Sequence, residues 1–207
     1  EEEHCAAIMN VWFGGSETAD ALCDVLFGSV SPSGKLTMTM PQSTGQVPIY
    51  YNHLNTGRPV AEGAKNYQKY ASNYIDVRND PLYPFGYGLS YTTFSYGKPS
   101  VESSAFNATS KITVTVDVTN TGSMDADEIV QLYIRDLACT ISRPVKELKG
   151  FERISLKAGE TKKVTMQVDR AALSYYNAQG ELVFEPGEFD IMVGPDSRNV
   201  QTVKVKL

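Results

Sequence analysis

The sequence predicts a two-part fold, an α/β segment followed by an all-β sandwich of the immunoglobulin-like type. Three observations carry this prediction. Residues 6–28 read as a buried strand, a turn and a helix; residues 41–84 show no hydrophobic periodicity; and from about residue 99 apolar and polar residues alternate with a period of two. The change of pattern places a domain boundary near residues 98 and 99.

The first predicted elements are a strand and a helix. Residues 6–13 (AAIMNVWF) form a nearly continuous apolar run, which is typical of a strand buried on both faces of a parallel sheet. Two glycines end this run. Ser16 is then expected to be the N-cap of a helix from Glu17 to Phe27, and Gly28 is expected to end it.

The stretch after the helix predicts one more strand and then an unusually long loop. Residues 35–40 (KLTMTM) lie between turn residues and Pro41, so the order strand, helix, strand indicates an α/β unit. Residues 41–84 are rich in Gly, Pro, Asn and Tyr. Because a compact domain rarely holds so long a loop unless the loop packs on something else, this stretch predicts a missing neighbour.

The second half predicts a β-sandwich. Ile112, Val114, Val116 and Val118 alternate with polar residues, as expected of a half-buried antiparallel strand. About seven short strands in roughly 110 residues fit an immunoglobulin-like sandwich. The expected strands span residues 112–118, 129–134, 146–151, 163–168, 182–184, 189–193 and 200–205.

Composition narrows the possible partners. The formal net charge is -5, the pI is near 5.1, and no run of basic residues is longer than the pair Lys162 and Lys163. We therefore expect no nucleic-acid partner. No apolar run approaches the roughly 18 residues of a membrane helix, so no membrane span is expected.

The three cysteines predict neither a disulfide framework nor a metal pair. Cys5, Cys23 and Cys139 are odd in number and widely spaced. We expect all three to be buried small apolar residues. No metal and no cofactor is expected.

Two segments look like nucleotide-binding motifs but do not match them. Residues 28–35 (GSVSPSGK) have one residue too many between their glycines for a phosphate-binding P-loop, and Leu36 replaces the Ser or Thr that would hold magnesium. The glycines of residues 85–88 (FGYG) lack the third glycine of a dinucleotide fingerprint. His4 and His53 are the only histidines, and both are expected to be ordinary polar residues.

Two further patterns have an alternative interpretation. The aromatic run of residues 83–96 has faces that suit sugar rings, but its interleaved Pro and Gly favour a rigid packed connector. Asn107 begins a match to the N-glycosylation sequon, and we assign it no function.

Five blocks in the first half resemble the end of the second domain of family 3 glycoside hydrolases. They occur in the order seen in that family and are distributed over residues 12–94. The blocks are WFGGSE (residues 12–17), DVLFG (24–28), PSGKL (32–36), GQVPIYY (45–51) and LYPFGYGLSYTTF (82–94).

The rest of the chain resembles the fibronectin-III-like domain that follows in many members of the family. The resemblance rests on VTVDVTNTGSMDADEIVQLYIRD, RPVKELKGFERISLKAGE and FEPGEFDIMVG. It implies that residues 1–98 are the C-terminal remnant of an α/β sandwich domain with a linker. Residues 99–207 are then a fibronectin-III-like β-sandwich.

The resemblance implies retaining, exo-acting hydrolysis of β-glucosides or related glycosides by two carboxylates in the full-length protein. In the family the nucleophile belongs to a preceding TIM-like barrel, and the acid/base carboxylate lies upstream of Trp12. Among the carboxylates here, Glu17 is expected to be a helix-start charge, and Glu62, Asp76 and Asp80 are expected to be loop acids. We therefore assign no catalytic, cofactor-binding or metal-binding residue to this chain.

The leading hypothesis is that the chain is the scaffold portion of a periplasmic or secreted β-glucosidase-like enzyme and is inactive alone. Its partners would be the missing barrel, the rest of the α/β domain and the saccharide substrate of the whole enzyme. The alternative is a carbohydrate-binding or adhesion module without hydrolase activity. A third hypothesis is dimerisation through an exposed sheet remnant.

Overall fold

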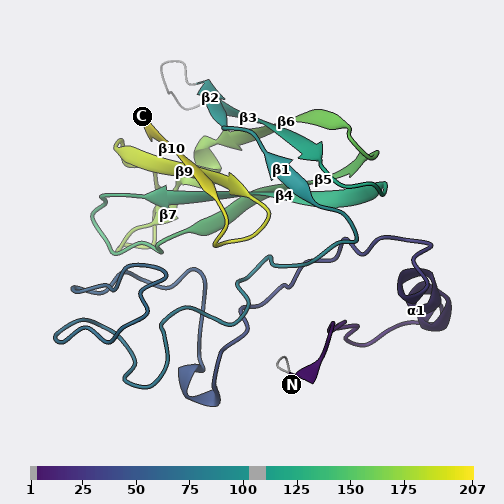
Figure 1. The fold of residues 1–207 in the computed structure, drawn as a ribbon. Helices are drawn as coiled ribbons and strands as arrows, with labels where there is room; N and C mark the ends of the chain where they lie inside the picture. The colour runs from purple at the N-terminus through teal and green to yellow at the C-terminus, as the bar shows by residue number, and fades with distance from the viewer. Residues whose placement is uncertain (1–3, 103–110) are drawn as a thin grey trace.

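The computed structural model describes residues 4–102 and 111–207, so the sequon at Asn107 lies outside the described residues. Figure 1 shows a β-sandwich, below which the N-terminal part of the chain runs with little regular structure. The structure is mostly β-sheet with few helices.

Two antiparallel sheets form the sandwich. In the first sheet, β3 (Lys111–Asn120) pairs with β1 (Phe94–Tyr96), β2 (Ser100–Glu102) and β6 (Thr161–Asp169). The second sheet has the order β10 (Gln201–Lys206), β9 (Glu188–Gly194), β4 (Ala126–Asp136) and β5 (Glu147–Leu156). A short helix, α2 (Arg170–Leu173), leads to a small hairpin of β7 (Tyr175–Tyr176) and β8 (Leu182–Val183).

The core lies between the two sheets and follows the predicted alternation. The four alternating residues of β3 from Ile112 to Val118 are at most 2% exposed. They belong to one apolar cluster with Leu132 of β4 and Ile191 of β9. The alternation predicted the buried face because successive side chains of a strand point to opposite faces.

Each of the seven predicted strand regions of the second half contains an observed strand. Sequence reasoning did not find β2 or β7, nor the continuation of β5 from residue 152 to Leu156. It also placed residues 94–96 in the first half, whereas β1 pairs with β3 in the sandwich.

The predicted helix is present as α1 (Thr18–Leu26), but the predicted cap is wrong. Glu17, not Ser16, occupies the N-cap position, and its side chain makes no capping hydrogen bond. Gly28 follows the helix with a positive φ of 77°, which suits glycine. None of the helical residues is buried.

The predicted strand at residues 6–13 is wrong. These residues form no strand and are exposed along their whole length. A strand buried in a parallel sheet needs hydrogen-bonded neighbours on both sides, and none of the described segments pairs with this one. Residues 35–40 likewise make only an isolated bridge between Met40 and Tyr83.

The expected burial of the cysteines is also wrong. Cys5 and Cys23 are exposed, and Cys139 is half-buried. Cys5 and Cys23 belong to the same exposed N-terminal segment as residues 6–13 and α1. The described residues therefore bury neither these two cysteines nor the predicted strand.

Candidate functional site

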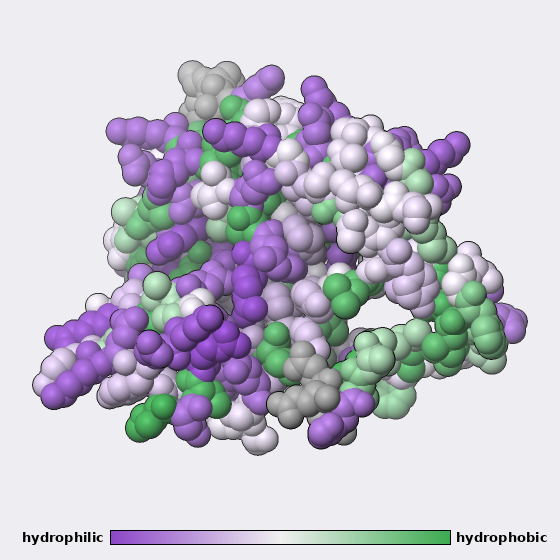
Figure 2. Space-filling view, in the orientation of Figure 1, coloured by the Kyte–Doolittle hydropathy of each residue, from purple (hydrophilic) through white to green (hydrophobic). Residues whose placement is uncertain are grey.

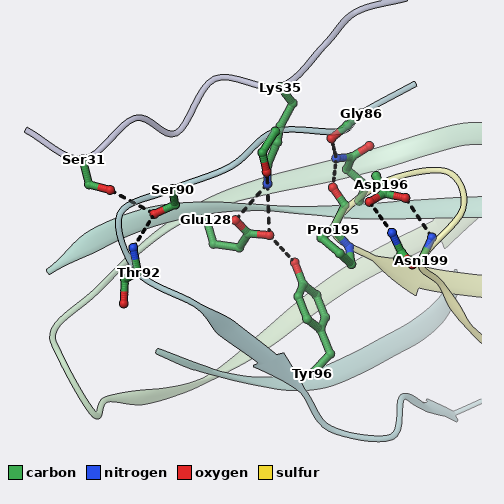
Figure 3. A network of polar contacts seen from close by, with 12 residues as sticks. Ser31, Lys35, Gly86, Ser90, Thr92, Tyr96, Glu128, Pro195, Asp196 and Asn199 are labelled. Atoms are coloured by element: carbon green, nitrogen blue, oxygen red, sulfur yellow. Dashed lines mark hydrogen bonds and ion pairs between the residues drawn. The ribbon is translucent and has the colours of Figure 1, made fainter. Parts of the chain in front are cut away.

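The two parts of the chain meet at a buried ion pair. Lys35 Nζ lies 3.1 Å from Glu128 Oε2, with the side chains 12% and 3% exposed. Tyr96 of β1 donates a hydrogen bond of 2.7 Å to the other oxygen of Glu128. Figure 3 shows the three side chains converging from the N-terminal segment, β4 and β1.

Because it is buried, this ion pair fixes the N-terminal segment at Lys35 to the sandwich. Burial and the neighbouring Glu128 carboxylate raise the pKa of Tyr96, so its hydroxyl stays protonated and donates. A buried carboxylate without partners would be very unfavourable. Glu128 therefore requires Lys35, and this requirement holds residues 31–36 against the sandwich.

A second buried contact joins the aromatic run to the sandwich. Gln131 of β4 donates through Nε2 to the Gly86 carbonyl at 3.1 Å and also to the Pro195 carbonyl. Gly86 has a φ of 81°, and a Cβ there would lie 2.1 Å from the Gln131 amide oxygen. Only glycine therefore fits at position 86.

The aromatic side chains of the run pack on one another and on the sandwich. Phe85 stacks on Tyr51 with ring centroids 4.3 Å apart, and Tyr51 meets Tyr133 of β4 edge-on at 5.8 Å. The rings of Tyr83 and Tyr87 stack at 5.1 Å. This arrangement fits the interpretation of the run as a packed connector.

The long loop is ordered by a buried glutamine rather than by strands. Gln46 is completely buried; its amide donates to the carbonyl of Arg78 at 2.7 Å and its carbonyl accepts from the backbone of Gln42. Buried backbone groups that lack a sheet need such partners. Gln46 lies in the GQVPIYY block, but no hydrophobic pattern predicted its burial, because a single polar residue in a polar loop has no periodic partner.

An open groove of about 920 Å³ lies between the loop and the sandwich. Glu62 bridges it, with carboxylate oxygens 3.6 Å from Arg198 Nε and 4.0 Å from Lys146 Nζ. Burial lowers the pKa of Lys146, whose ammonium also donates to the Ser197 carbonyl at 2.6 Å.

The other acids considered from the sequence have separate places. Glu17 starts α1, Asp76 is exposed, and Asp80 accepts from the backbone N–H of Gly63 at 3.1 Å. His53 contacts the sandwich through its backbone, which accepts from the N–H of Val145 at 2.9 Å, and His4 is exposed. Within residues 4–102 and 111–207, no cluster of His, Cys, Asp and Glu could hold a metal ion.

The N-terminal segment presents a large apolar surface. Phe13 and Phe27 are 102% and 83% exposed, and the other exposed large apolar residues nearby are Ile8, Met9, Val11, Trp12, Leu26 and Val30. Figure 2 shows hydrophobic residues gathered over α1, to the lower right. Contiguous patches of this kind mark interaction surfaces. None of the helices in the described part of the chain is long and apolar enough to cross a membrane.

Two family models match the chain. Residues 1–91 match the glycosyl hydrolase family 3 C-terminal domain, and residues 128–197 match a fibronectin type III-like domain.

Curated relatives match nearly the whole chain. A periplasmic β-glucosidase of Salmonella typhimurium is 47% identical over 97% of this chain, and a β-xylosidase of Formosa agariphila is 43% identical over 95%. The chain covers 26% of each. It therefore spans about a quarter of the length of these relatives.

A solved structure shows the same fold. The β-glucosidase of Listeria innocua in complex with gluconolactone superposes with a TM-score of 0.88 at 44% identity, over 95% of this chain and 27% of that one. With both family models matching in order, the chain is homologous to the C-terminal part of the family 3 β-glucosidases and consists of a family 3 C-terminal domain followed by a fibronectin-III-like domain.

Proposed function

We propose that this chain is the C-terminal scaffold portion of a retaining, exo-acting β-glucosidase-like glycoside hydrolase, and that the chain alone is inactive. The observation that carries the proposal is the exposed apolar surface of residues 8–30 in a chain that spans a quarter of its relatives. Because stable exposed patches of this kind need a cover, we infer that the remainder of the same polypeptide packs there.

The proposed partner is the missing part of the α/β domain, together with the TIM-like barrel that precedes it. Residues 6–13 have the composition of a strand buried on both faces, and here they lack strand neighbours among the described residues. Joining the missing strands would convert this segment into a strand and bury α1. We keep residues 1–98 and 99–207 as the proposed domain limits.

The relatives support a proposed substrate class and location. Their names include β-glucosidases and β-xylosidases, so we propose that the whole enzyme hydrolyses β-glucosides or related glycosides. The Salmonella relative is periplasmic, which supports a periplasmic or secreted enzyme. We propose no catalytic residue, cofactor or metal within this chain.

Hydrolysis of 4-nitrophenyl β-glucoside and β-xyloside tests the proposal. The chain alone should release no nitrophenol, and the whole polypeptide should. Release by the chain alone would show that its own carboxylates do the chemistry, with Glu17 the first to substitute. An intact, folded whole polypeptide that cleaved neither substrate would contradict the glycosidase assignment.

The docking surface has its own test, which mixes this chain with the separately produced upstream portion. Phe27→Asp should weaken their association at least tenfold, because it places a charge in the interface. Phe151→Asp is the matched control, since Phe151 is 65% exposed on β5 of the sandwich. Equal effects of the two substitutions would contradict the proposed surface. Dimers of the chain alone that Phe27→Asp abolishes would identify self-association through the same uncovered surface.

A further inference from the structure

Two cations in the wall of the 920 Å³ groove have more hydrogen-bond donors than the described residues use. The Lys146 side chain is only 15% exposed, and within the described residues its ammonium donates one hydrogen bond, to the Ser197 carbonyl. Within the same residues the guanidinium of Arg198 also donates one, through Nη2 to the Pro81 carbonyl at 3.0 Å. Because an ammonium has three N–H donors and a guanidinium has five, several donors remain for a further partner.

The acceptor in the same wall is Glu62 of the long loop. Its carboxylate oxygens lie 3.6 Å from Arg198 Nε and 4.0 Å from Lys146 Nζ, and both distances are too long for a hydrogen bond. An ionised carboxylate has two oxygens that can each accept more than one hydrogen bond. Glu62 is therefore near enough to balance the two cations but keeps its capacity to accept hydrogen bonds from a ligand.

The cations are held in place before any ligand binds. The carbonyls of Ser197 and Pro81 fix the ends of the Lys146 and Arg198 side chains. The turn that carries Arg198 is itself fixed, because Asp196 accepts from the backbone N–H groups of Arg198 and Asn199 at 2.8 Å each. Polar groups that are already ordered lose little conformational entropy on binding, so this wall is suited to a ligand.

The balance of charges favours a neutral ligand with many hydroxyls. Glu62 lies beside both cations, and Asp196 also interacts electrostatically with Lys146, so two positive charges face two negative charges. An added anion would be repelled by Glu62, and an added cation would be repelled by Lys146 and Arg198. A hydroxyl both donates and accepts, so neighbouring hydroxyls can bond to the carboxylate and to the cations at the same time.

The long loop also supplies aromatic rings to the groove. Tyr50 lines the groove and is 61% exposed. Tyr74 lines it as well, and its hydroxyl donates to the Gln46 carbonyl at 3.4 Å, which holds the ring in place. Aromatic rings offer apolar faces of the kind that can pack on the C–H faces of sugar rings. The volume of the groove lies within the ~300–1,000 Å³ typical of small-molecule sites.

We propose that this groove binds a short neutral oligosaccharide, whose hydroxyls bond to Glu62, Lys146 and Arg198 and whose rings pack on Tyr50. The unused donors, the free carboxylate and the balanced charges support a neutral polyol. The choice of β-linked glucose or xylose units rests on the proposed function. Because Tyr50 and Glu62 belong to the loop, and Lys146 and Arg198 belong to the sandwich, the ligand would join these two parts of the chain.

Isothermal titration of the 207-residue chain with three probes tests this site. The probes are cellotetraose, xylotetraose and tetragalacturonic acid. At least one of the neutral probes should bind about tenfold more tightly than the acid, because the carboxylates of the acid meet Glu62. Equal affinity for all three probes would overturn the proposal. Absence of binding by both neutral probes at millimolar concentration would also overturn it and would leave water as the partner of these groups.

Two variants locate the binding. Glu62→Gln should reduce the affinity for the neutral probe about tenfold, because it removes the charge-assisted hydrogen bonds. Its matched control is Glu152→Gln, at an exposed position of β5. Tyr50→Ala should reduce the affinity about fivefold, because it removes the ring on which the sugar packs. Its matched control is Tyr176→Ala, since Tyr176 is 67% exposed and lies outside the groove.

The outcomes of these titrations are separate from those of the hydrolysis test. Unchanged affinity in either groove variant, with the thermal midpoint of unfolding also unchanged, would refute the site. The whole polypeptide could then still hydrolyse 4-nitrophenyl β-glucoside, and the proposed function would stand. Saccharide binding by the chain together with an inactive whole polypeptide would have the opposite meaning, because the groove would bind sugar in a protein that is not a glycosidase.

Discussion

At the residue scale, Glu128 stands out because it occupies the core-facing side of β4. The same face carries Val130, Leu132 and Ile134, and all four residues are at most 4% exposed. An apolar residue would be expected there. The carboxylate is tolerated because Lys35 and Tyr96 reach it from two other segments, so a single residue ties three segments together.

Replacing Glu128 with glutamine should destabilise the chain. Glu128→Gln keeps the shape but leaves the largely buried Lys35 ammonium without its counter-charge, which should lower the free energy of unfolding by about 3 kcal/mol. Urea unfolding followed by circular dichroism measures the change. The control, Glu152→Gln, alters an exposed residue of β5 and should change the value by less than about 0.5 kcal/mol. Similar losses in both variants would argue against a role for the ion pair.

Asp127 should make part of the stability depend on pH. A hydrogen bond from Ser155 and the nearby Arg153 hold the pKa of Asp127 below its usual 3.8, although its burial opposes this. The folded state therefore binds fewer protons than the unfolded state near that pH. The contribution is fully present above 3.8 and is lost as the pH falls through the folded pKa.

The measurement is the pH dependence of the unfolding free energy in acid. Asp127→Asn should show a shallower loss of stability below pH 3.8 than the unchanged chain. Asp117→Asn, at an exposed position of β3, should retain the original slope. A parallel curve for Asp127→Asn would show that this carboxylate does not contribute.

Sequence reasoning found residues where they follow a periodic pattern or belong to a block that resembles the family. The alternation of β3 predicted its buried face, and the PSGKL block included Lys35. The partner of Lys35 is 93 positions away, and no periodicity relates the two. The same holds for Gln131 and Gly86, which are 45 positions apart, because this contact arises from packing between segments.

At the element scale, β9 is a central strand of the second sheet, between β4 and β10. Ile191 of β9 is completely buried in the apolar cluster. Ile191→Ala should lower the free energy of unfolding by about 3 kcal/mol, because it removes three methyl or methylene groups and leaves a cavity. Thr202→Ala, at an exposed position of the neighbouring β10, should have less than about a quarter of that effect. Urea titration compares the two, and equal effects would place the core elsewhere.

Whether an element could be predicted depended on where its hydrogen-bond partners are. The sandwich strands pair with one another inside the chain, so their pattern and structure agree. Helix α1 also formed, because its backbone bonds are internal. Residues 6–13 carry an equally clear strand pattern but have no partner strand among the described residues, and they form no strand and are exposed.

At the scale of the whole molecule, the chain has one complete core and one uncovered surface. The apolar cluster lies within the sandwich, and residues 29–98 are fixed to it through Lys35, Gly86 and the Tyr51 ring. Residues 8–30 contribute no side chain to this core. The sandwich is thus a rigid base, and the N-terminal segment is the part that the rest of the polypeptide would complete.

Hydrogen exchange should show this division directly. In the chain alone, the amides of α1 should exchange quickly, because none of the helical residues is buried and short isolated helices are marginal in water. In the whole polypeptide, residues 6–13 and α1 should become protected by at least a hundredfold, whereas amides of β3, β4 and β9 should change little, since their sheet bonds are already complete. Protection of the sandwich alone, with residues 6–26 still exchanging quickly in the whole polypeptide, would show that the uncovered surface is not the site at which the missing domains dock.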